Sequence, residues 1–341
     1  MSLEWAAGVI RAASLEEHQN VVSEVWDLDF SPLVAGQLSS KTVFLATPRM
    51  VVYDEHWDRP IHLRGALGKG QVAFAIPTRE GLPFRLGGKQ VGPAQIPWMS
   101  DAGELDIVTT DRYRNVVMIF DAKFLQGIAA QVQHPFARTS LHSQPIASQA
   151  HAGKTEHLRW KVESMLRDVE LRSAGRLSRE ARASRMDEHL AAALLDTLVL
   201  DPGDASEGVA LDTSTQRYQA VRECIDYSRS RGFDVTIPEL CGLIGKSRRT
   251  LEYAFQESIG VSPARLLYYG RLRGVHWDLI AGRPEGITVT RVATRWGFFE
   301  LGRFAGAYRQ YFHELPSETL RRSPRTADSI PLLGAGRRNP A

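Results

Sequence analysis

Arginine, glutamine and glutamate side chains recur at helical spacing in two stretches of the C-terminal third of the chain. Such side chains suit the recognition of bases, since the arginine guanidinium and the glutamine amide form bidentate hydrogen bonds with guanine and adenine. A helix N-terminus also attracts phosphate. We therefore expect the outward-facing residues of these stretches to contact DNA: Ser247, Arg248, Arg249, Glu252, Tyr253 and Gln256 in the first, and Glu300, Arg303, Ala307 and Gln310 in the second.

Two pairs of short helices are needed to position these side chains. The first pair consists of a helix over residues 237–245 that ends at Gly245, and a helix over 247–259 with Ser247 as its N-cap. Apolar residues recur every four positions on the inner face of the second helix, at Leu251, Phe255 and Ile259. A helix, a glycine-bearing turn and a second helix form a helix-turn-helix, which places its second helix in the major groove of DNA.

The same pattern occurs again after a long connecting helix. Residues 288–298 predict a short helix followed by a turn at Gly297, and residues 300–312 predict the next helix. The expected inner face of that helix carries Leu301, Phe304, Tyr308 and Phe312. The connecting helix over 262–282 has Pro263 at its first helical position. About 20 residues span about 30 Å, close to the pitch of DNA of about 34 Å, so two reading helices would reach successive major grooves.

Residues 217–322 resemble the DNA-binding domain of AraC/XylS-type transcriptional regulators. The resemblance rests on the runs SRRTLEYAFQESIGVSPARLLYYGRLRGVHWDL and ITVTRVATRWGFFELGRFAGAYRQYFHELPSETLRR, which carry the family's Leu, Phe, Gly, Ser-Pro, Gly-Phe and Arg positions in order. It implies two helix-turn-helix subdomains, joined by a long helix, that bind promoter DNA as an activator or a repressor. One position departs from the family. The second reading helix ends at His313 where the family usually has glycine, so a left-handed C-cap there is either strained or replaced by another turn.

Charge is unevenly distributed along the 341 residues. Residues 1–210 carry 22 Lys and Arg against 26 Asp and Glu, a net charge of −4, whereas residues 211–341 carry 20 against 13, a net charge of +7. Nineteen of those 20 C-terminal cations are arginine, which suits phosphate and guanine edges better than lysine does. The C-terminal part is thus expected to bind double-stranded promoter DNA.

The N-terminal half has a different pattern. Short β-favouring runs between turn residues occupy residues 41–121 and predict a small antiparallel barrel or sandwich. Three-to-four-residue apolar spacing predicts amphipathic helices over 123–131, 155–173 and 178–200, a set that packs on the barrel or on a second subunit. This half resembles the cupin-like sensory barrels of many AraC-type regulators. The predicted fold class is α+β: an N-terminal antiparallel β-barrel with flanking helices, then an all-α double helix-turn-helix domain.

A run rich in Gly, Ser, Asp and Pro divides the chain. We expect a sensory and dimerisation domain over residues 1–200, a linker over 201–214, a DNA-binding domain over 215–325 and a disordered tail over 326–341. The resemblance to AraC-type regulators implies a homodimer formed through the N-terminal domain.

Two groups of N-terminal residues are candidates for binding a small-molecule effector. Aromatic residues would line a ligand cavity or simply fill the barrel: Trp26, Tyr53, Trp57, Phe74 and Phe84. An arginine-rich run forms the second group: Arg172, Arg176, Arg179, Arg182 and Arg185. The last three lie near the start of the helix predicted over 178–200 and oppose its dipole, which indicates carboxylate partners or an anionic effector. Arg172 and Arg176 also resemble the arginine motif of PilZ-type cyclic-dinucleotide receptors, without the Asp-x-Ser-x-x-Gly motif that accompanies it.

Neither catalysis nor a bound metal has support in the sequence. No Gly-x-Ser-x-Gly, His-Glu-x-x-His or P-loop pattern occurs, and His56 and His62 stand six positions apart instead of forming the His-x-His pair of a metal cupin. Cys224 and Cys241 are expected to be small buried thiols on helices. We expect no enzyme, no cofactor and no metal. Two alternatives stay open: a cupin-type enzyme with an appended DNA-binding module, and a constitutive DNA binder whose N-terminal half only dimerises.

The composition is that of an ordinary globular protein. Hydrophobic residues make up 43% of the chain, charged residues 24%, and the mean hydropathy is −0.24, which excludes disordered, collagenous and coiled-coil chains. No apolar run approaches the roughly 20 residues that span a bilayer, and the N-terminus carries charges where a signal peptide is apolar. We expect a cytoplasmic protein with no membrane partner.

Overall fold

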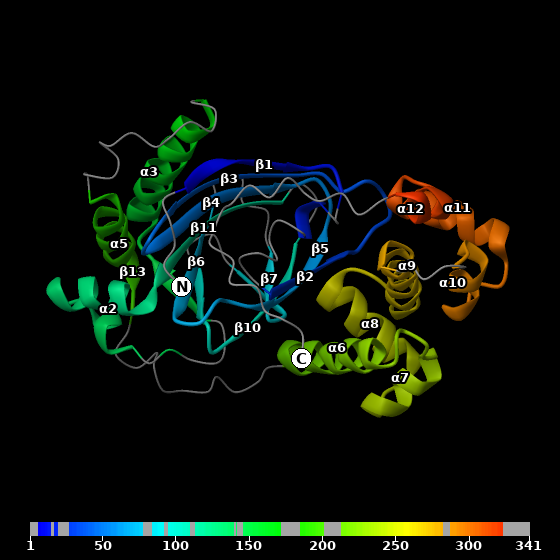
Figure 1. The fold of residues 1–341 in the computed structure, drawn as a ribbon. Helices are drawn as coiled ribbons and strands as arrows, with labels where there is room; N and C mark the ends of the chain where they lie inside the picture. Colours follow the sequence, from blue (N-terminus) through cyan, green and yellow to red (C-terminus); the bar gives the residue numbers. More distant parts are fainter. Residues whose placement is uncertain are drawn as a thin grey trace. The chain divides into compact units, whose positions relative to one another are not determined.

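A computed structural model describes residues 6–14, 17–19, 27–77, 84–91, 95–109, 113–139, 141, 146–171, 185–200, 213–281 and 287–322. These residues form two compact units (Figure 1). Within the described residues, the first unit comprises 6–31 and 38–200, and the second comprises 32–37 and 213–322. The expected tail lies outside the described residues, and of the expected linker only Thr213 and Ser214 are described, at the start of a helix.

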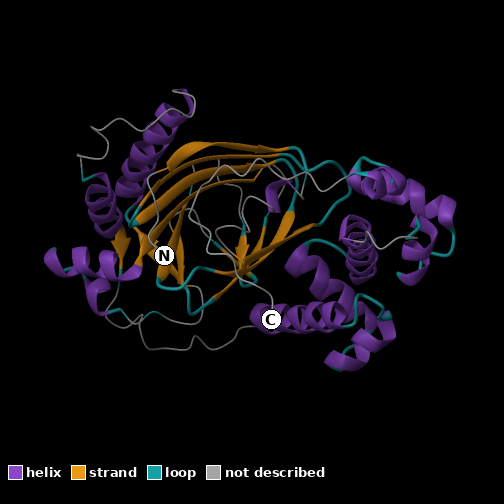
Figure 2. Ribbon diagram, in the orientation of Figure 1, coloured by secondary structure: helices purple, strands orange, loops and turns teal. Residues whose placement is uncertain are grey.

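Two antiparallel sheets form the framework of the first unit (Figure 2). The larger has the strand order β1-β3-β4-β11-β6-β9-β12-β13, and the smaller has the order β2-β5-β10-β7-β8. The strands of the larger sheet are β1 (Ala6–Ala12), β3 (Ser40–Thr47), β4 (Met50–Trp57), β6 (Gln71–Ile76), β9 (Gln95–Ser100), β11 (Tyr113–Asp121), β12 (Ile146–Ala150) and β13 (Leu198–Val199). The strands of the smaller sheet are β2 (Asp27–Pro32), β5 (Ile61–Ala66), β7 (Arg85–Leu86), β8 (Lys89–Gln90) and β10 (Glu104–Val108).

The predicted antiparallel β architecture is confirmed, but the sheets are not closed into a barrel. In the described part of the chain, β1 and β13 each have one strand neighbour and remain edges of the larger sheet. The strands expected over 41–121 are present as β3, β4, β6, β7, β8, β10 and β11. The structure adds β5 and β9 within that range. Outside it, β1, β12 and β13 extend the larger sheet at both ends, and β2 forms one edge of the smaller sheet.

Helices cover one face of the larger sheet: α2 (Ala122–Gln131), α3 (Ala152–Leu171) and α5 (Met186–Thr197), with a 3₁₀ turn, η1 (Pro135–Arg138). Successive residues of a strand point to opposite faces. Val116, Met118 and Phe120 of β11 accordingly share one core with Leu158 of α3 and Leu194 of α5. The helical pair therefore packs on the sheet, which is one of the two placements expected from the sequence.

The helix predicted over 178–200 ends earlier than expected. Residues 178–184 lie outside the described residues, and α5 stops at Thr197. Leu198 and Val199 instead form β13, which pairs with Ala150 and Gln149 of β12. Pairing with a strand edge thus overrides the helical spacing of the leucines, since the β-branched Val199 fits a strand well.

Only helices occur in residues 213–281 and 287–322 of the second unit. They are α6 (Thr213–Ser230), α7 (Ile237–Ile244), α8 (Arg248–Ile259), α9 (Pro263–Ala281), α10 (Val289–Arg295), α11 (Leu301–Phe312) and α12 (Pro316–Arg321). Leu272 and Val275 of α9 share a core with Val292 of α10 and with Phe304 and Tyr308 of α11. This is the all-α arrangement that the sequence predicts.

The strained C-cap expected at the end of α11 is present. His313 adopts φ 60°, and its amide N–H donates to the carbonyl of Arg309 at 2.8 Å. A side chain in this left-handed conformation costs about 1 kcal/mol, which glycine avoids. We expect His313→Gly to raise the free energy of unfolding of the second unit by about 1 kcal/mol, measured by urea denaturation. The reciprocal control is Gly245→Ala at φ 63°, which should lower it; an unchanged or lower stability of His313→Gly would contradict the prediction.

Candidate nucleic-acid interface

The first helix-turn-helix is defined by local caps. Helix α7 begins with a capping box, in which Thr236 Oγ1 accepts from the amide of Glu239 at 3.3 Å and Glu239 Oε2 accepts from the amide of Thr236 at 2.6 Å. It ends at Gly245, whose φ of 63° favours glycine. Ser247 then caps α8, its Oγ accepting from the amide of Thr250 at 3.3 Å. The predicted boundaries of both helices are confirmed.

Helix α8 separates an inner from an outer face. Leu251, Phe255 and Ile259 are buried, as the sequence predicts. The side chains expected to contact DNA are all exposed: Ser247, Arg248, Arg249, Glu252, Tyr253 and Gln256. The structure therefore presents these residues to solvent on one helix.

Several of these exposed side chains interact with each other or with α6. Arg248 Nε donates to Glu252 Oε1 at 2.8 Å, and this hydrogen bond raises the pKa of the Arg248 guanidinium. Tyr253 is 58% exposed, and the guanidinium of Arg217 lies 5.5 Å from its ring centre. Gln256 Nε2 donates to the carbonyl of Gly260 at 3.2 Å, at the C-terminal end of the helix. An arginine donates up to five hydrogen bonds, so the pairing of Arg248 leaves donors for a ligand.

The second helix-turn-helix repeats this arrangement. Thr288 Oγ1 accepts from the amide of Arg291 at 3.2 Å and caps α10, and Gly297 adopts φ 78° in the turn. Glu300 and Arg303, at the start of α11, are exposed and paired, with 3.1 Å between Arg303 Nη1 and Glu300 Oε2. Gln310 is exposed, whereas Ala307 is half-buried.

The inner face predicted for α11 is wrong at its first residue. Phe304 and Tyr308 are buried, but Leu301 is 38% exposed, because as the first helical residue it lies outside the core formed by α9, α10 and α11. Phe299 was not expected to be exposed and is the most exposed large apolar side chain of the described residues, at 77%. The sequence signal for this exposure is the pair Phe298–Phe299, because two consecutive side chains do not share one face. Phe298 lies in the core with 8% of its surface exposed.

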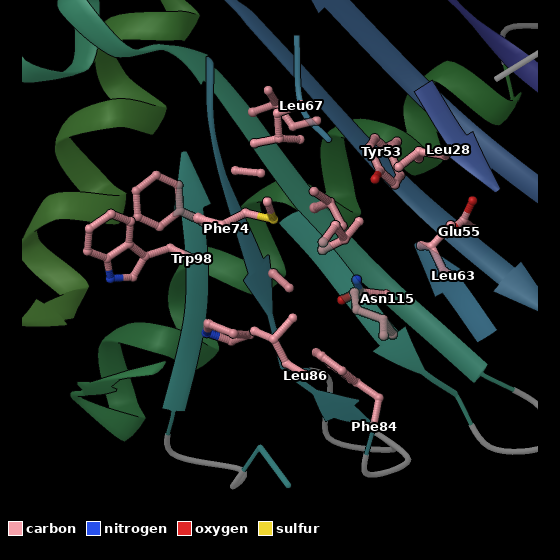
Figure 3. A pocket seen from close by; sticks show the side chains of 18 of the residues that line it. Leu28, Tyr53, Glu55, Leu63, Leu67, Phe74, Phe84, Leu86, Trp98 and Asn115 are labelled. Carbon is pink, nitrogen blue, oxygen red and sulfur yellow. The ribbon is translucent and has the colours of Figure 1, made fainter. Parts of the chain in front are cut away.

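The candidate effector residues fall into two groups. Tyr53, Phe74 and Phe84 line a cavity between the two sheets (Figure 3). Trp57 is buried beside His18, with 4.1 Å between the ring centres, and is not among the described residues that line this cavity. The remaining candidates lie outside the described residues: Trp26, Arg172, Arg176, Arg179 and Arg182.

The described residues contain no group of three or more His, Cys, Asp or Glu side chains that could hold a metal ion. Cys224 is buried on α6, as expected, and desolvation raises the pKa of its thiol to about 12. Cys241 on α7 is only half-buried, so the expected burial is wrong for this thiol. Among the helices described, none is both long and apolar enough to cross a membrane.

Comparison with known proteins supports the C-terminal resemblance. Residues 240–322 match the family described as "Helix-turn-helix domain". A solved structure of a probable AraC family transcriptional regulator from Rhodopseudomonas palustris is 40% identical in sequence; the match covers 31% of this chain and 97% of that chain, with a TM-score of 0.29. The chain belongs to the AraC family.

Two curated regulatory proteins match a part of the chain and less than half of their own length. The probable thc operon regulatory protein of Rhodococcus erythropolis is 39% identical over 105 residues, 30% of this chain and 32% of that protein. The XylDLEGF operon transcriptional activator 1 of Pseudomonas putida is 29% identical over 138 residues, 40% of this chain and 41% of that protein. The chain thus matches about a third of the length of the first of these relatives.

Proposed function

We propose that the protein is a sequence-specific DNA-binding transcription regulator, controlled by a small effector bound in its N-terminal unit. The observation that carries DNA binding is the pair of helix-turn-helix motifs, each with an exposed, arginine-bearing second helix. The net charge of +7 over residues 211–341 favours a polyanionic partner. The relatives named above are regulators, which supports a regulator over a cupin-type enzyme. A protein that binds promoter DNA would act in the cytoplasm.

The connecting helix α9 gives the spacing of the two reading helices. Its 19 residues correspond to a length of about 28 Å, close to the pitch of DNA of about 34 Å. In this proposal α8 and α11 enter successive major grooves on the same side of the duplex. Arg248 and Arg249 lie in the first turn of α8, and Arg303 lies in the first turn of α11, where a helix in the groove contacts base edges.

Replacing Arg248, Arg249 or Arg303 with alanine is expected to weaken binding to a selected promoter site. A bidentate contact with guanine is worth about 1 to 3 kcal/mol, and its loss relaxes selectivity at one base pair. Fluorescence anisotropy on the selected site and on variants of each base pair measures both effects. Arg309→Ala, on the same helix as Arg303 but in its last turn, serves as the matched control. Unchanged affinity and selectivity in all three variants would contradict the assignment.

Salt dependence tests the same proposal without mutation. Binding releases counterions from phosphates, so log K should fall linearly with log salt concentration, with a slope of about −0.9 for each phosphate neutralised. Each of the three alanine variants that loses a phosphate contact should reduce the slope by about one. A flat salt profile of the wild-type protein would show that its partner is not DNA.

We expect the effector to act by changing how two linked copies of the chain are arranged. We propose a homodimer formed through the N-terminal unit, in which the effector shifts the copies between arrangements by its differential affinity for them. An anionic effector such as a cyclic dinucleotide remains a prediction that rests on residues outside the described chain: Arg172, Arg176, Arg179 and Arg182.

A further inference from the structure

A cavity of about 70 Å³ lies between the two sheets of the N-terminal unit (Figure 3). Apolar side chains from both sheets form most of its wall. Leu63, Leu86 and Ile107 come from the smaller sheet, and Met99, Val117 and Ile119 come from the larger. Such a surface favours an apolar ligand, since burial of its surface is the main source of affinity.

Polar groups gather at one end of this cavity because of the strand register. In the antiparallel pair β4–β11, Glu55 lies directly opposite Asn115, and Tyr53 lies opposite Val117. Residues two apart along a strand share a face, so Tyr53 and Glu55 face the cavity together with Tyr113 and Asn115. The cavity is thus amphipathic, with one carboxyl, one amide and two phenol groups at one end of an apolar wall.

Glu55 carries the only ionisable carboxyl among the described residues that line the cavity. Burial raises the pKa of Glu55 to about 7. His18 Nε2 lies 3.7 Å from Glu55 Oε1, which is beyond hydrogen-bond distance, and burial lowers the pKa of His18 to about 3, so its ring is neutral. The other nearby charged groups, Asp54 and His56, lie on the opposite face of β4.

The described residues that line the cavity include no lysine, arginine or histidine. An anionic group placed beside Glu55 would therefore be desolvated without a countercharge, which is strongly unfavourable. A hydrogen-bond donor placed there would instead pair with the carboxyl. The charge distribution of the cavity thus favours a ligand whose polar group donates a hydrogen bond over a ligand whose polar group is negatively charged.

We propose that this cavity binds a compact, mainly apolar molecule, such as a substituted aromatic ring. The molecule carries one amine or hydroxyl group, which donates a hydrogen bond to the carboxyl of Glu55. The aromatic walls formed by Tyr53, Phe84 and Tyr113 suit a ring. This inference rests on the proposed function, since the molecule would be the effector of the regulator. It assigns the class of ligand for this cavity and predicts that carboxylates and phosphates bind there more weakly.

Calorimetry on the full-length chain tests the proposal at about pH 8, above the pKa of Glu55, so that its carboxyl is mainly ionised. Four ligands of matched size are compared: toluene, benzyl alcohol, benzylamine and benzoate. They share one ring and differ in the polar group. Benzylamine and benzyl alcohol are expected to bind at least about tenfold more tightly than toluene, because a hydrogen bond to a charged group is worth that much. Benzoate is expected to bind most weakly of the four.

Two variants and a control locate the binding. Glu55→Gln should weaken the binding of benzylamine about tenfold or more and strengthen the binding of benzoate, because the glutamine amide carries no charge and can donate a hydrogen bond. Ala75→Leu should abolish binding of all four ligands by filling the cavity that Ala75 lines. Glu156→Gln, an exposed position on α3, should leave every affinity unchanged. Thermal unfolding of each variant reports whether it folds, and the wild-type ranking is decisive without any variant.

Three results would overturn the proposal: no binding of any of the four ligands, benzoate binding as tightly as benzylamine, or the same ranking in the wild type and in Glu55→Gln. None of them bears on promoter binding, which is measured without ligand. Conversely, loss of promoter binding with intact benzylamine binding would overturn the regulator proposal and leave the ligand assignment standing. The two failures are therefore distinguishable.

Discussion

Replacing Gly274 with alanine is expected to lower the free energy of unfolding of the second unit by about 3 kcal/mol. Gly274 lies within α9 against the indole ring of Trp296, and a methyl group at this position would overlap the ring. The ring has little freedom to move, since Trp296 Nε1 donates to Asp278 Oδ2 at 2.8 Å and Trp296 is the C-cap of α10. The overlap would therefore push α10 away from α9. Urea denaturation of the fragment 211–341, followed by circular dichroism, measures the loss.

The sign of this effect makes the test specific. In a helix interior, glycine to alanine ordinarily stabilises by about 1 kcal/mol. Gly306→Ala in α11 is the matched control, because nothing lies within 4 Å of the added methyl group, and it should raise the stability. Gly270→Ala should destabilise, because the methyl group would overlap the ring of Phe233. A gain in stability for Gly274→Ala would show that α9 and α10 do not pack as closely as described.

The helices of the second unit could be predicted because their signals are local. Ser247 and Thr288 cap α8 and α10 through their own side chains, and Gly245 takes the left-handed conformation that ends α7. Each signal lies within a few residues of the boundary that it sets. The close approach at Gly274 could not be predicted, because it depends on a residue 22 positions away in another helix.

The sheets could be predicted only in part. Alternating apolar residues reveal β3, β4 and β11 as strands, but the position of β11 between β4 and β6 depends on pairing between distant segments. That pairing is set by burial across the whole unit, so the sequence could not show that the predicted barrel stays open as two sheets. The open edge at β13 and the early end of α5 have the same cause.

The two candidate sites differ in how far the sequence reveals them. The outer faces of α8 and α11 follow from the helical period alone, and the structure places Arg248, Arg249 and Arg303 on them. Glu55 was missed, although a signal exists: it shares one strand face with Val51 and Tyr53, and a carboxyl on an apolar face is unusual. Its role requires the register with β11, which places Asn115 opposite.

The two units differ in charge in a way that bears on DNA binding. The net charge is +7 over residues 211–341 and −4 over residues 1–210, so the first should attract duplex DNA and the second should repel it. We expect the fragment 211–341 to bind DNA on its own and the fragment 1–210 not to bind. The N-terminal unit would then contribute to binding only by linking two copies of the DNA-binding unit.

Full-length protein is expected to bind a tandem pair of half-sites about 10² to 10⁴ times more tightly than the fragment 211–341, while both bind a single half-site about equally. The gain arises because a linked second module meets its half-site at a high effective concentration, provided that the geometry lets both modules engage. Anisotropy titrations of both proteins on single and tandem sites measure it, with the half-sites moved apart by half a DNA turn as a control that should remove the gain. Equal affinity of both proteins for the tandem site would show that the N-terminal unit does not link two copies of the chain. An effector bound in that unit could then not change how two DNA-binding units engage the half-sites.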